Sequence, residues 1–140
     1  MEAPDKMTPD LTHRDEGLSW SETYDHTVRH GYASAYRDDL HKLEDAFVAG
    51  RVVRRMRQLS SQLRRTPRVL DVGCGTGEFL RSHPVSPGDY TGIDISPAMI
   101  HAASTPRSPW SGCFVCEDFV EYVPVTKPDL IVALWGPLNY

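Results

Sequence analysis

The chain has 140 residues, of which 40% are hydrophobic, and its 15 basic and 19 acidic residues give a net charge of −4. This length fits one domain with a real core and excludes two ordinary ones, and the acidic balance argues against a general nucleic-acid binder. The longest apolar run, at 130–135, is far shorter than the roughly 20 residues of a membrane span. Because the start of the chain also lacks a basic and apolar leader, we expect a cytoplasmic protein without membrane association.

The first half of the chain is predicted to be a tail followed by helices. Residues 1–17 contain two prolines, alternating charges and no apolar periodicity, which predicts a disordered or loosely held tail. Residues 18–66 are interpreted as a helical lid or cap, with the clearest helical pattern from Asp39 to about Leu63. Gly50 is predicted to be a kink or a break, since it interrupts the apolar stripe. That stripe consists of Leu40, Leu43 and Phe47 before Gly50, and Val52, Met56, Leu59 and Leu63 after it.

The same helical region is rich in arginine. Seven arginines occur within 18 residues: Arg51, Arg54, Arg55, Arg57, Arg64, Arg65 and Arg68. They indicate either a face that binds phosphate or another anion, or simply the solvated side of an amphipathic helix.

The pattern after Pro67 changes to short apolar runs that alternate with helices. The predicted strands are 68–72, 90–95, 113–116 and 129–135. A short helix is predicted from Glu78 and a second one after Ser96, a suitable N-cap followed by proline. This alternation predicts an α/β domain over 67–140, with a parallel sheet and right-handed crossovers. The last strand is apolar at nearly every position, which predicts burial on both faces.

A glycine-rich loop joins the first predicted strand to its helix, within the sequence VLDVGCGTGEFL at 69–80. Asp71 ends the strand, and Gly73, Gly75 and Gly77 follow at alternate positions. Glycines allow the backbone to turn tightly and a ligand to approach closely, and unpaired N–H groups at the start of the helix favour an anionic group. We therefore expect a phosphate or carboxylate group of a ligand at this loop.

Acidic residues follow the next two predicted strands. Asp94 ends the second strand, and a carboxylate there can accept both ribose hydroxyls of a nucleoside cofactor. Asp118 and Phe119 follow the third strand, where they could accept a bond from an adenine amine and pack on its ring. A capping acid and a core aromatic are the alternative for this pair.

These segments resemble the class I S-adenosylmethionine-dependent methyltransferases. VLDVGCGTG at 69–77 is similar to the first motif of that family, YTGIDISPAMI at 90–100 to the second-strand motif, and CEDF at 116–119 to the third. Residues 129–140 resemble the fourth strand and the segment facing the sulfonium. The resemblance implies a Rossmann-like parallel sheet with flanking helices and the strand order 3-2-1-4. It also implies methyl transfer from S-adenosylmethionine, with S-adenosylhomocysteine as the product, and we expect a small-molecule acceptor.

The resemblance also implies roles for individual residues. Asp71 would order the loop and lie near the methionine ammonium, while Gly73 and Gly75 would bring the backbone close to the methionine. Asp94 would hold the ribose hydroxyls. The whole predicted cofactor site comprises Asp71, Gly73, Cys74, Gly75, Gly77, Asp94, Ile95, Met99, Asp118, Phe119 and Leu134. Ile95 and Met99 would pack on the adenine, and Leu134 would approach the methionine end.

Some features leave alternatives open. A nicotinamide site competes for the glycine loop, but that fingerprint needs its third glycine where this chain has Glu78. His26, His30 and the neighbouring tyrosines are candidate bases, but we assign no catalytic residue. The segment 135–140 lacks the Asn/Asp-Pro-Pro-aromatic signature of many nucleobase and amide methyltransferases, which favours a small-molecule acceptor over nucleic acid.

The cysteines predict neither a disulfide framework nor a metal site. Three cysteines are an odd number, and Cys113 and Cys116 form one C-x-x-C without a second pair or suitably spaced histidines. Inside a strand the two side chains would point to opposite faces, so we interpret them as buried apolar thiols.

The resemblance also implies an incomplete fold. The family usually has seven strands, and this chain ends after the fourth, whose edge would be left unpaired. We expect a homodimer, a partner polypeptide that covers this strand, or truncation of a longer enzyme. The alternative function is a non-catalytic cofactor-binding or scaffolding subunit that supports a partner enzyme.

Overall fold

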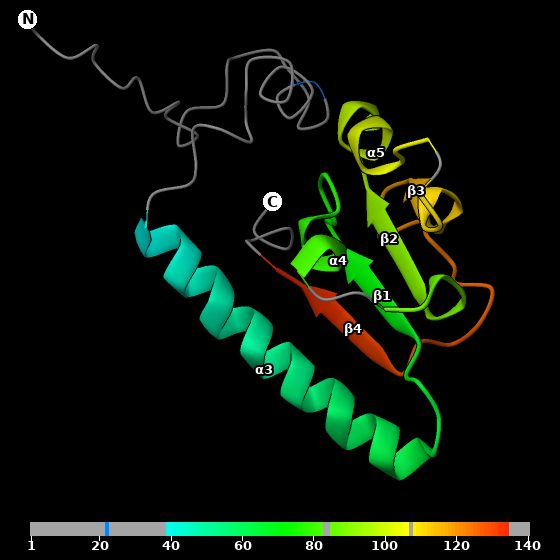
Figure 1. Cartoon of the computed structure of the whole chain (residues 1–140). Coiled ribbons are helices and arrows are strands. Elements are labelled where there is room, and N and C mark those ends of the chain that lie inside the picture. The colour runs from blue at the N-terminus through cyan, green and yellow to red at the C-terminus, as the bar shows by residue number, and fades with distance from the viewer. Residues whose placement is uncertain (1–21, 23–38, 83–84, 107, 135–140) are drawn as a thin grey trace, which may run out of the picture.

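A computed structural model of the chain describes residues 22, 39–82, 85–106 and 108–134 (Figure 1). The predicted tail at 1–17, the candidate bases His26 and His30 and the segment 135–140 lie outside these residues. The helices are α3 (Asp39–Leu63), α4 (Glu78–Ser82) and α5 (Pro97–Ala103), with the short 3-10 helices η1 (Pro87–Asp89) and η2 (Ser111–Cys113). The strands are β1 (Val69–Val72), β2 (Tyr90–Asp94), β3 (Phe114–Cys116) and β4 (Leu130–Ala133).

The four strands form one parallel sheet in the order β3-β2-β1-β4. This order confirms the expected Rossmann-like arrangement. The strands β1 and β2 pair from Val69 opposite Tyr90 to Val72 opposite Ile93. All strands therefore end at one edge of the sheet, where ligands bind in open α/β folds.

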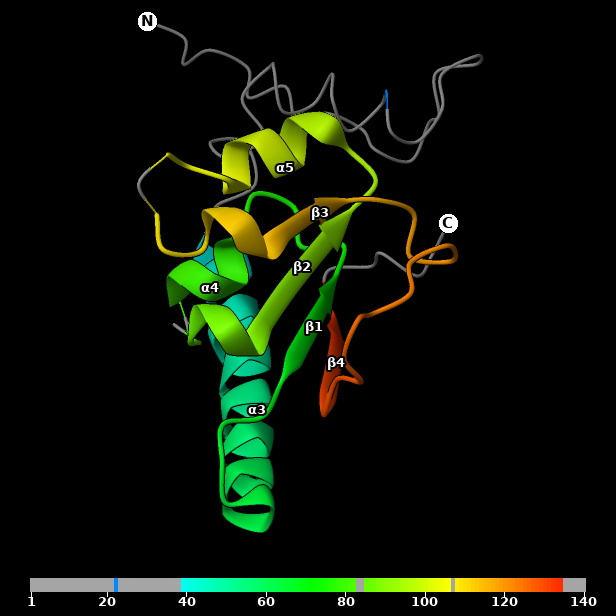
Figure 2. The same ribbon diagram turned by 90° about the vertical axis from the view of Figure 1, so that its right-hand side faces the viewer.

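The described helices cover one face of the sheet. The core on this face contains Val69, Tyr90 and Val132 from the strands and Phe79 from α4, and Met56 of α3 packs against it. Figure 2 shows α3 and α4 on this side, with the segment 117–129 on the other. The opposite face carries a smaller core, which consists of Leu70, Val72 and Ile93 with Val115, Tyr122 and Ala133 packed against it.

The long helix α3 corrects two expectations. It runs from Asp39 to Leu63 without a break, so the kink or break predicted at Gly50 is wrong. A continuous helix turns about 100° per residue, which places Phe47 on the side opposite Met56. The two predicted stripes therefore cannot both face the core. Residues of the second stripe contact the sheet, whereas Leu43 and Phe47 are each 68% exposed.

The strand β4 also differs from its expectation, because it is not buried on both faces. Val132 lies in the core beside α3, but Ile131 on the opposite face is 60% exposed. In the segment 117–129 next to this face, Val123 and Val125 are exposed as well. The described part of the sheet thus has one covered face and one sparsely covered face. Among the described residues, no helix is long and apolar enough to cross a membrane.

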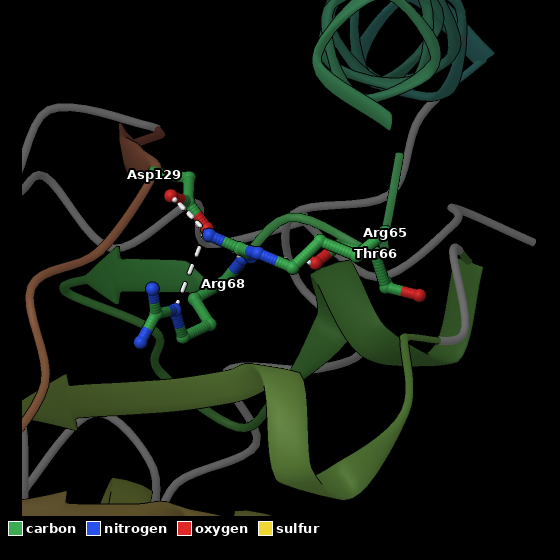
Figure 3. Close-up of polar contacts among 4 residues, drawn as sticks. All are labelled: Arg65, Thr66, Arg68 and Asp129. Carbon is green, nitrogen blue, oxygen red and sulfur yellow. Dashed lines mark hydrogen bonds and ion pairs between the residues drawn. The ribbon is translucent and has the colours of Figure 1, made fainter. Parts of the chain in front are cut away.

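An ion-pair cluster fixes the end of α3 to the sheet (Figure 3). Arg65 donates two hydrogen bonds to Asp129, at 2.7 and 2.9 Å, and the backbone N–H of Arg68 donates a third at 2.8 Å. The backbone N–H of Asp129 in turn donates to the carbonyl of Arg68 at 2.9 Å. These contacts hold the pKa of Asp129 well below its usual range, chiefly through Arg65. Two of the seven arginines therefore have a structural partner.

Candidate functional site

The glycine loop lies at the carboxyl end of β1, before α4, as the sequence predicts. Gly73, Gly75 and Gly77 all have positive φ angles of 68°, 54° and 79°. Side chains other than glycine rarely adopt this conformation, which explains the alternate spacing. At Gly77 a Cβ would also lie 3.1 Å from the ring of Phe114, whereas at Gly75 it would meet only the Sδ of Met99 at 3.9 Å. The backbone at Gly75 is therefore the more open part of the loop.

Hydrogen bonds within the protein hold this loop in shape. The N–H groups of Gly73 and Cys74 both donate to the carbonyl of Ile93, at 2.8 and 3.0 Å, and that of Gly77 donates to Cys74. The N–H of Gly75 donates to a carboxylate oxygen of Asp94 at 2.9 Å. These four N–H groups already have acceptors within the protein. A ligand would instead approach the Cα side of the glycines.

Asp94 joins the loop to the end of β2. Its Oδ2 accepts the bond from Gly75, and its Oδ1 accepts one from the N–H of Ser96 at 2.9 Å. Ser96 is fully buried, and its hydroxyl caps α5 by accepting from Met99. Each carboxylate oxygen can accept more than one hydrogen bond, so Asp94 keeps the capacity to accept hydroxyl groups of a ligand.

A buried acid–phenol pair lies beneath the loop. Asp71 is 2% exposed, and the hydroxyl of Tyr90 donates a 2.7 Å hydrogen bond to its Oδ2. Burial raises the pKa of Asp71 to about 7, and the hydrogen bond from Tyr90 opposes this shift only in part. Burial and the charge of Asp71 in turn raise the pKa of Tyr90. Asp71 therefore titrates near neutral pH.

Gly92 makes room for this pair. It lies opposite Asp71 in the sheet, and a Cβ on it would come within 2.9 Å of both the Tyr90 hydroxyl and the Cys74 Sγ. Cys74 is buried, and burial raises the pKa of its thiol, as does the charge of Asp71. The sequence analysis missed Tyr90 and Gly92. The glycine within an otherwise apolar strand was the available signal, because such glycines mark a close approach.

The remaining predicted site residues differ in their exposure. Met99 is 2% exposed and lies below Gly75, while Ile95 is 42% exposed at the end of β2. Asp118 and Phe119 are exposed after β3, where the Asp118 carboxylate accepts a bond from the N–H of Val120. This turn lies near Asp94, because the N–H of Glu117 donates to the Asp94 carbonyl at 3.0 Å.

Leu134 lies apart from this group. It follows β4 and packs, half-buried, against the core on the side of α3. The loop, Asp94 and the turn after β3 thus share the carboxyl edge, while Leu134 extends that edge past β4.

This arrangement fits a nucleoside cofactor with a positively charged amino-acid portion. Two features support this fit. The Asp94 carboxylate at the end of β2 suits ribose hydroxyls, and the open backbone at Gly75 allows a ligand to make close contact. Ile95 and Phe119 provide exposed apolar surface at the same edge. Asp94 and Asp71 make the edge acidic, which suits an ammonium rather than a pyrophosphate.

The C-x-x-C residues do not form a buried pair. Cys116 is exposed and Cys113 is half-buried at the end of η2, outside the strand, so their interpretation as buried thiols is wrong. The third strand begins only at Phe114, which leaves Cys113 before it. In the described part of the chain, no group of three or more His, Cys, Asp or Glu side chains could hold a metal ion.

A family model and several known proteins match this chain. The sequence model of a family described as "Methyltransferase domain" matches residues 33–134, which is well over half of the chain. A tRNA (guanine-N(7)-)-methyltransferase from Rubrobacter xylanophilus is 32% identical over 76 residues, which cover 49% of this chain and 33% of that protein.

Solved structures of the plantazolicin methyltransferase BpumL show a more distant likeness. One, in complex with S-adenosylhomocysteine, is 22% identical with a TM-score of 0.46 and covers 80% of this chain and 46% of that one. A second, which also holds a monoazolic desmethylPZN analog, has a TM-score of 0.45. The chain therefore spans a third to about half of the length of the relatives it matches.

Proposed function

The chain belongs to the class I S-adenosylmethionine-dependent methyltransferase family, and from this premise we propose that it transfers a methyl group from S-adenosylmethionine to a small-molecule acceptor. S-adenosylhomocysteine is the corresponding product. One observation supports the proposal above the others: the Asp94 carboxylate at the end of β2 is hydrogen-bonded to the backbone of the glycine loop at Gly75. The two elements that a nucleoside cofactor requires are thereby fixed side by side.

Each residue of the proposed site would make a specific contact. Asp94 would accept the ribose hydroxyls, and the backbone at Gly73 and Gly75 would lie along the methionine portion. Asp71, beneath the loop, would stabilise the methionine ammonium through its charge. Ile95, Phe119 and the Asp118 carboxylate would surround the adenine and its amine. Met99 would support the loop from below rather than contact the solvent-facing side of the ring.

The chemistry requires little from the protein beyond placement. The sulfonium of the bound cofactor supplies an activated methyl group, so the chain must hold the acceptor in line and exclude water. A general base is needed only for an acceptor that loses a proton during the transfer. No described residue is assigned that role.

Calorimetry with S-adenosylmethionine and S-adenosylhomocysteine tests the cofactor site. Asp94→Ala should weaken both ligands by roughly tenfold or more, because hydrogen bonds to a charged group contribute about 1.5–3 kcal/mol each. Asp89→Ala is the matched control, since it removes a carboxylate just before the other end of β2. If the wild type binds neither ligand, or if Asp94→Ala binds as tightly as the wild type, the assignment fails. Binding of NAD instead would support the nicotinamide site.

The class of acceptor needs a separate experiment. The sequence of 135–140 supports a small molecule, whereas one relative carries the name of a tRNA methyltransferase. The full chain is incubated with methyl-labelled S-adenosylmethionine and either bulk tRNA or a low-molecular-weight cell extract. Label in the extract supports the proposal, and label in tRNA contradicts it.

A second candidate function is a non-catalytic subunit that binds the cofactor and supports a partner. The exposed side chain of Ile131 and the exposed valines near it favour this candidate, because further polypeptide would cover such a surface. A second copy of the chain or a different polypeptide could complete the site in this way. Cofactor binding without turnover by the isolated chain would support this function, and turnover by the isolated chain would contradict it. The cytoplasmic location stays a prediction from the sequence.

A further inference from the structure

The outward face of α3 carries an unusual concentration of positive charge. Arg65 and Arg68 pair with Asp129, but the other five arginines of this region are exposed. Four of them belong to α3 and the fifth follows it directly: Arg51, Arg54, Arg55, Arg57 and Arg64. Residues 51–68 contain no acidic residue, so no neighbour in sequence neutralises them. Within the described residues, none of the five forms an ion pair.

The net charge of −4 conceals this asymmetry. Residues 1–50 contain 11 acidic and 5 basic residues, whereas residues 51–140 contain 8 acidic and 10 basic residues. The acidic excess thus belongs to the first 50 residues. The helix face beyond Gly50 is locally strongly basic, although the chain as a whole is acidic.

An exposed aromatic ring lies on the same face. Phe47 is 68% exposed, and the Arg51 guanidinium lies 6.0 Å from the centre of its ring. At about 100° per residue, Phe47, Arg51, Arg54 and Gln58 share one side of the helix, opposite Met56. The nearly flat surface next to them is formed by polar side chains, namely Arg55, Arg57, Gln58, Ser61 and Gln62.

From these observations we propose that the outward face of α3, from Phe47 to Arg64, binds the phosphate backbone of a single nucleic-acid strand. The arginines would contact phosphates, which their planar guanidinium groups can hold with two hydrogen bonds each. The ring of Phe47 would stack on a base, as aromatic side chains do in proteins that bind single strands. From Arg51 to its end at Leu63 the helix rises roughly 18 Å, which is long enough to follow several phosphates.

The way α3 is packed explains why a single strand fits better than other polyanions. Val52, Met56 and Leu59 hold the helix against the sheet, so its apolar side is not available to enter a membrane. The exposed ring of Phe47 favours a strand with unpaired bases over a duplex. A protein partner is less suitable, because the centre of a protein–protein interface is usually apolar, whereas this face presents mainly Arg, Gln and Ser. The inference goes beyond the proposed function, because this face is separate from the glycine loop.

Fluorescence anisotropy of the full chain with a labelled, unstructured RNA tests this proposal. If three phosphates are contacted, the affinity should fall roughly 20-fold between about 50 and about 200 mM salt, following a log–log slope near −2. Single-stranded DNA of the same sequence should bind similarly, because phosphates and not 2′-hydroxyls are contacted.

Two sets of variants separate charge from stacking. Replacing Arg51, Arg54 and Arg57 together by alanine should remove most of the salt dependence, whereas replacing the same three by lysine should retain it. Phe47→Ala should weaken binding roughly tenfold with an unchanged salt slope, and Phe47→Tyr should bind like the wild type. Thermal melts and S-adenosylmethionine calorimetry of the same variants should match the wild type, because these side chains are exposed and do not belong to the proposed cofactor site.

Several results would overturn the proposal. They are no RNA binding at the lower salt concentration, equal binding by the triple alanine variant, or displacement of the RNA by polyglutamate of matched charge concentration. Binding to anionic lipid vesicles without binding to RNA would equally contradict it.

Discussion

At the scale of single residues, the carboxyl edge of the sheet depends on how closely three side chains fit around a glycine. Tyr90 reaches Asp71 only because Gly92 has no Cβ, and Cys74 occupies the rest of that space. The sequence predicts Asp71, Asp94 and the three loop glycines as site residues from their spacing. It does not predict the Tyr90 contact, because residues 19 positions apart meet only through the parallel pairing of β1 and β2.

Gly92→Ala should destabilise the protein. The added methyl group would come within 3.0 Å of both atoms of the Cys74 side chain and of the Tyr90 hydroxyl, and such overpacking costs about 1–3 kcal/mol. Urea denaturation of the variant measures the change. Gly112→Ala is the matched control, because a Cβ there has no neighbour within 4 Å, and it should leave stability nearly unchanged. Equal stability of the two variants would contradict this prediction, because it would mean that Cys74 and Tyr90 can move away from the added methyl group at little cost in free energy.

Asp71 should make stability depend on pH near neutrality. Its pKa is about 7 in the folded protein against 3.8 for a free aspartate, so the folded state holds a proton that the unfolded state releases between these values. Stability should therefore fall as the pH rises from about 4 to about 7, by roughly 4 kcal/mol for this group. Unfolding free energies of the wild type and Asp71→Asn at several pH values between about 5 and 8 measure the effect. The wild type should lose stability relative to the variant across this range, and parallel curves would contradict the raised pKa.

At the scale of secondary structure elements, the periodicity of the sequence predicts the helix α3 but not which of its sides faces the sheet. The bounds of α3 and the start of α5 agree with expectation, because the apolar pattern, proline and the cap at Ser96 are local signals. The strand order also agrees, but that expectation comes from the resemblance to the methyltransferase family and not from a local signal. The outward position of Phe47 is not predicted, since it depends on whether the helix bends at Gly50. The tertiary contacts of Val52, Met56 and Leu59 decide which side faces the sheet, and they are not visible in a local pattern.

Gly50→Ala tests the continuity of α3. A Cβ on Gly50 would have nothing within 4 Å, and alanine favours a helix interior over glycine by about 0.5–1 kcal/mol. The variant should therefore be more stable by that amount in thermal or urea denaturation, with the same helical circular dichroism signal. A loss of stability would indicate a bend at Gly50 that alanine opposes.

At the scale of the whole molecule, the described sheet has a sparsely covered apolar face and an edge strand. Only Val132 and Leu130 of β4 take part in the core near α3, and Ile131 projects on the other side. The resemblance to the methyltransferase family correctly places β4 beside β1 and implies an edge there. It does not predict the exposure of Ile131, because an apolar strand at an edge and one buried on both faces have the same composition.

Association through this surface should be measurable. Exposed apolar edge strands promote pairing with another chain, and a charged side chain opposes it. Sedimentation velocity should show concentration-dependent association of the wild type and a shift toward monomer for Ile131→Lys. Val132→Lys is unsuitable as a control because it would disrupt the core, so Lys127→Ala, on the exposed segment before β4, serves instead. A wild type that stays monomeric at high concentration would contradict the proposed covering of β4.

The ion-pair cluster at Asp129 has a consequence for the order of folding. Asp129 follows Arg65 by 64 residues, so the carboxyl end of α3 is secured only after β4 has docked beside β1. Contacts between residues so far apart in sequence form slowly, because a long loop must close first. During synthesis, these contacts would therefore form only once the segment before the fourth strand has emerged. Hydrogen exchange of the Arg68 amide, which donates to the Asp129 carboxylate, would report the docking of β4 beside β1.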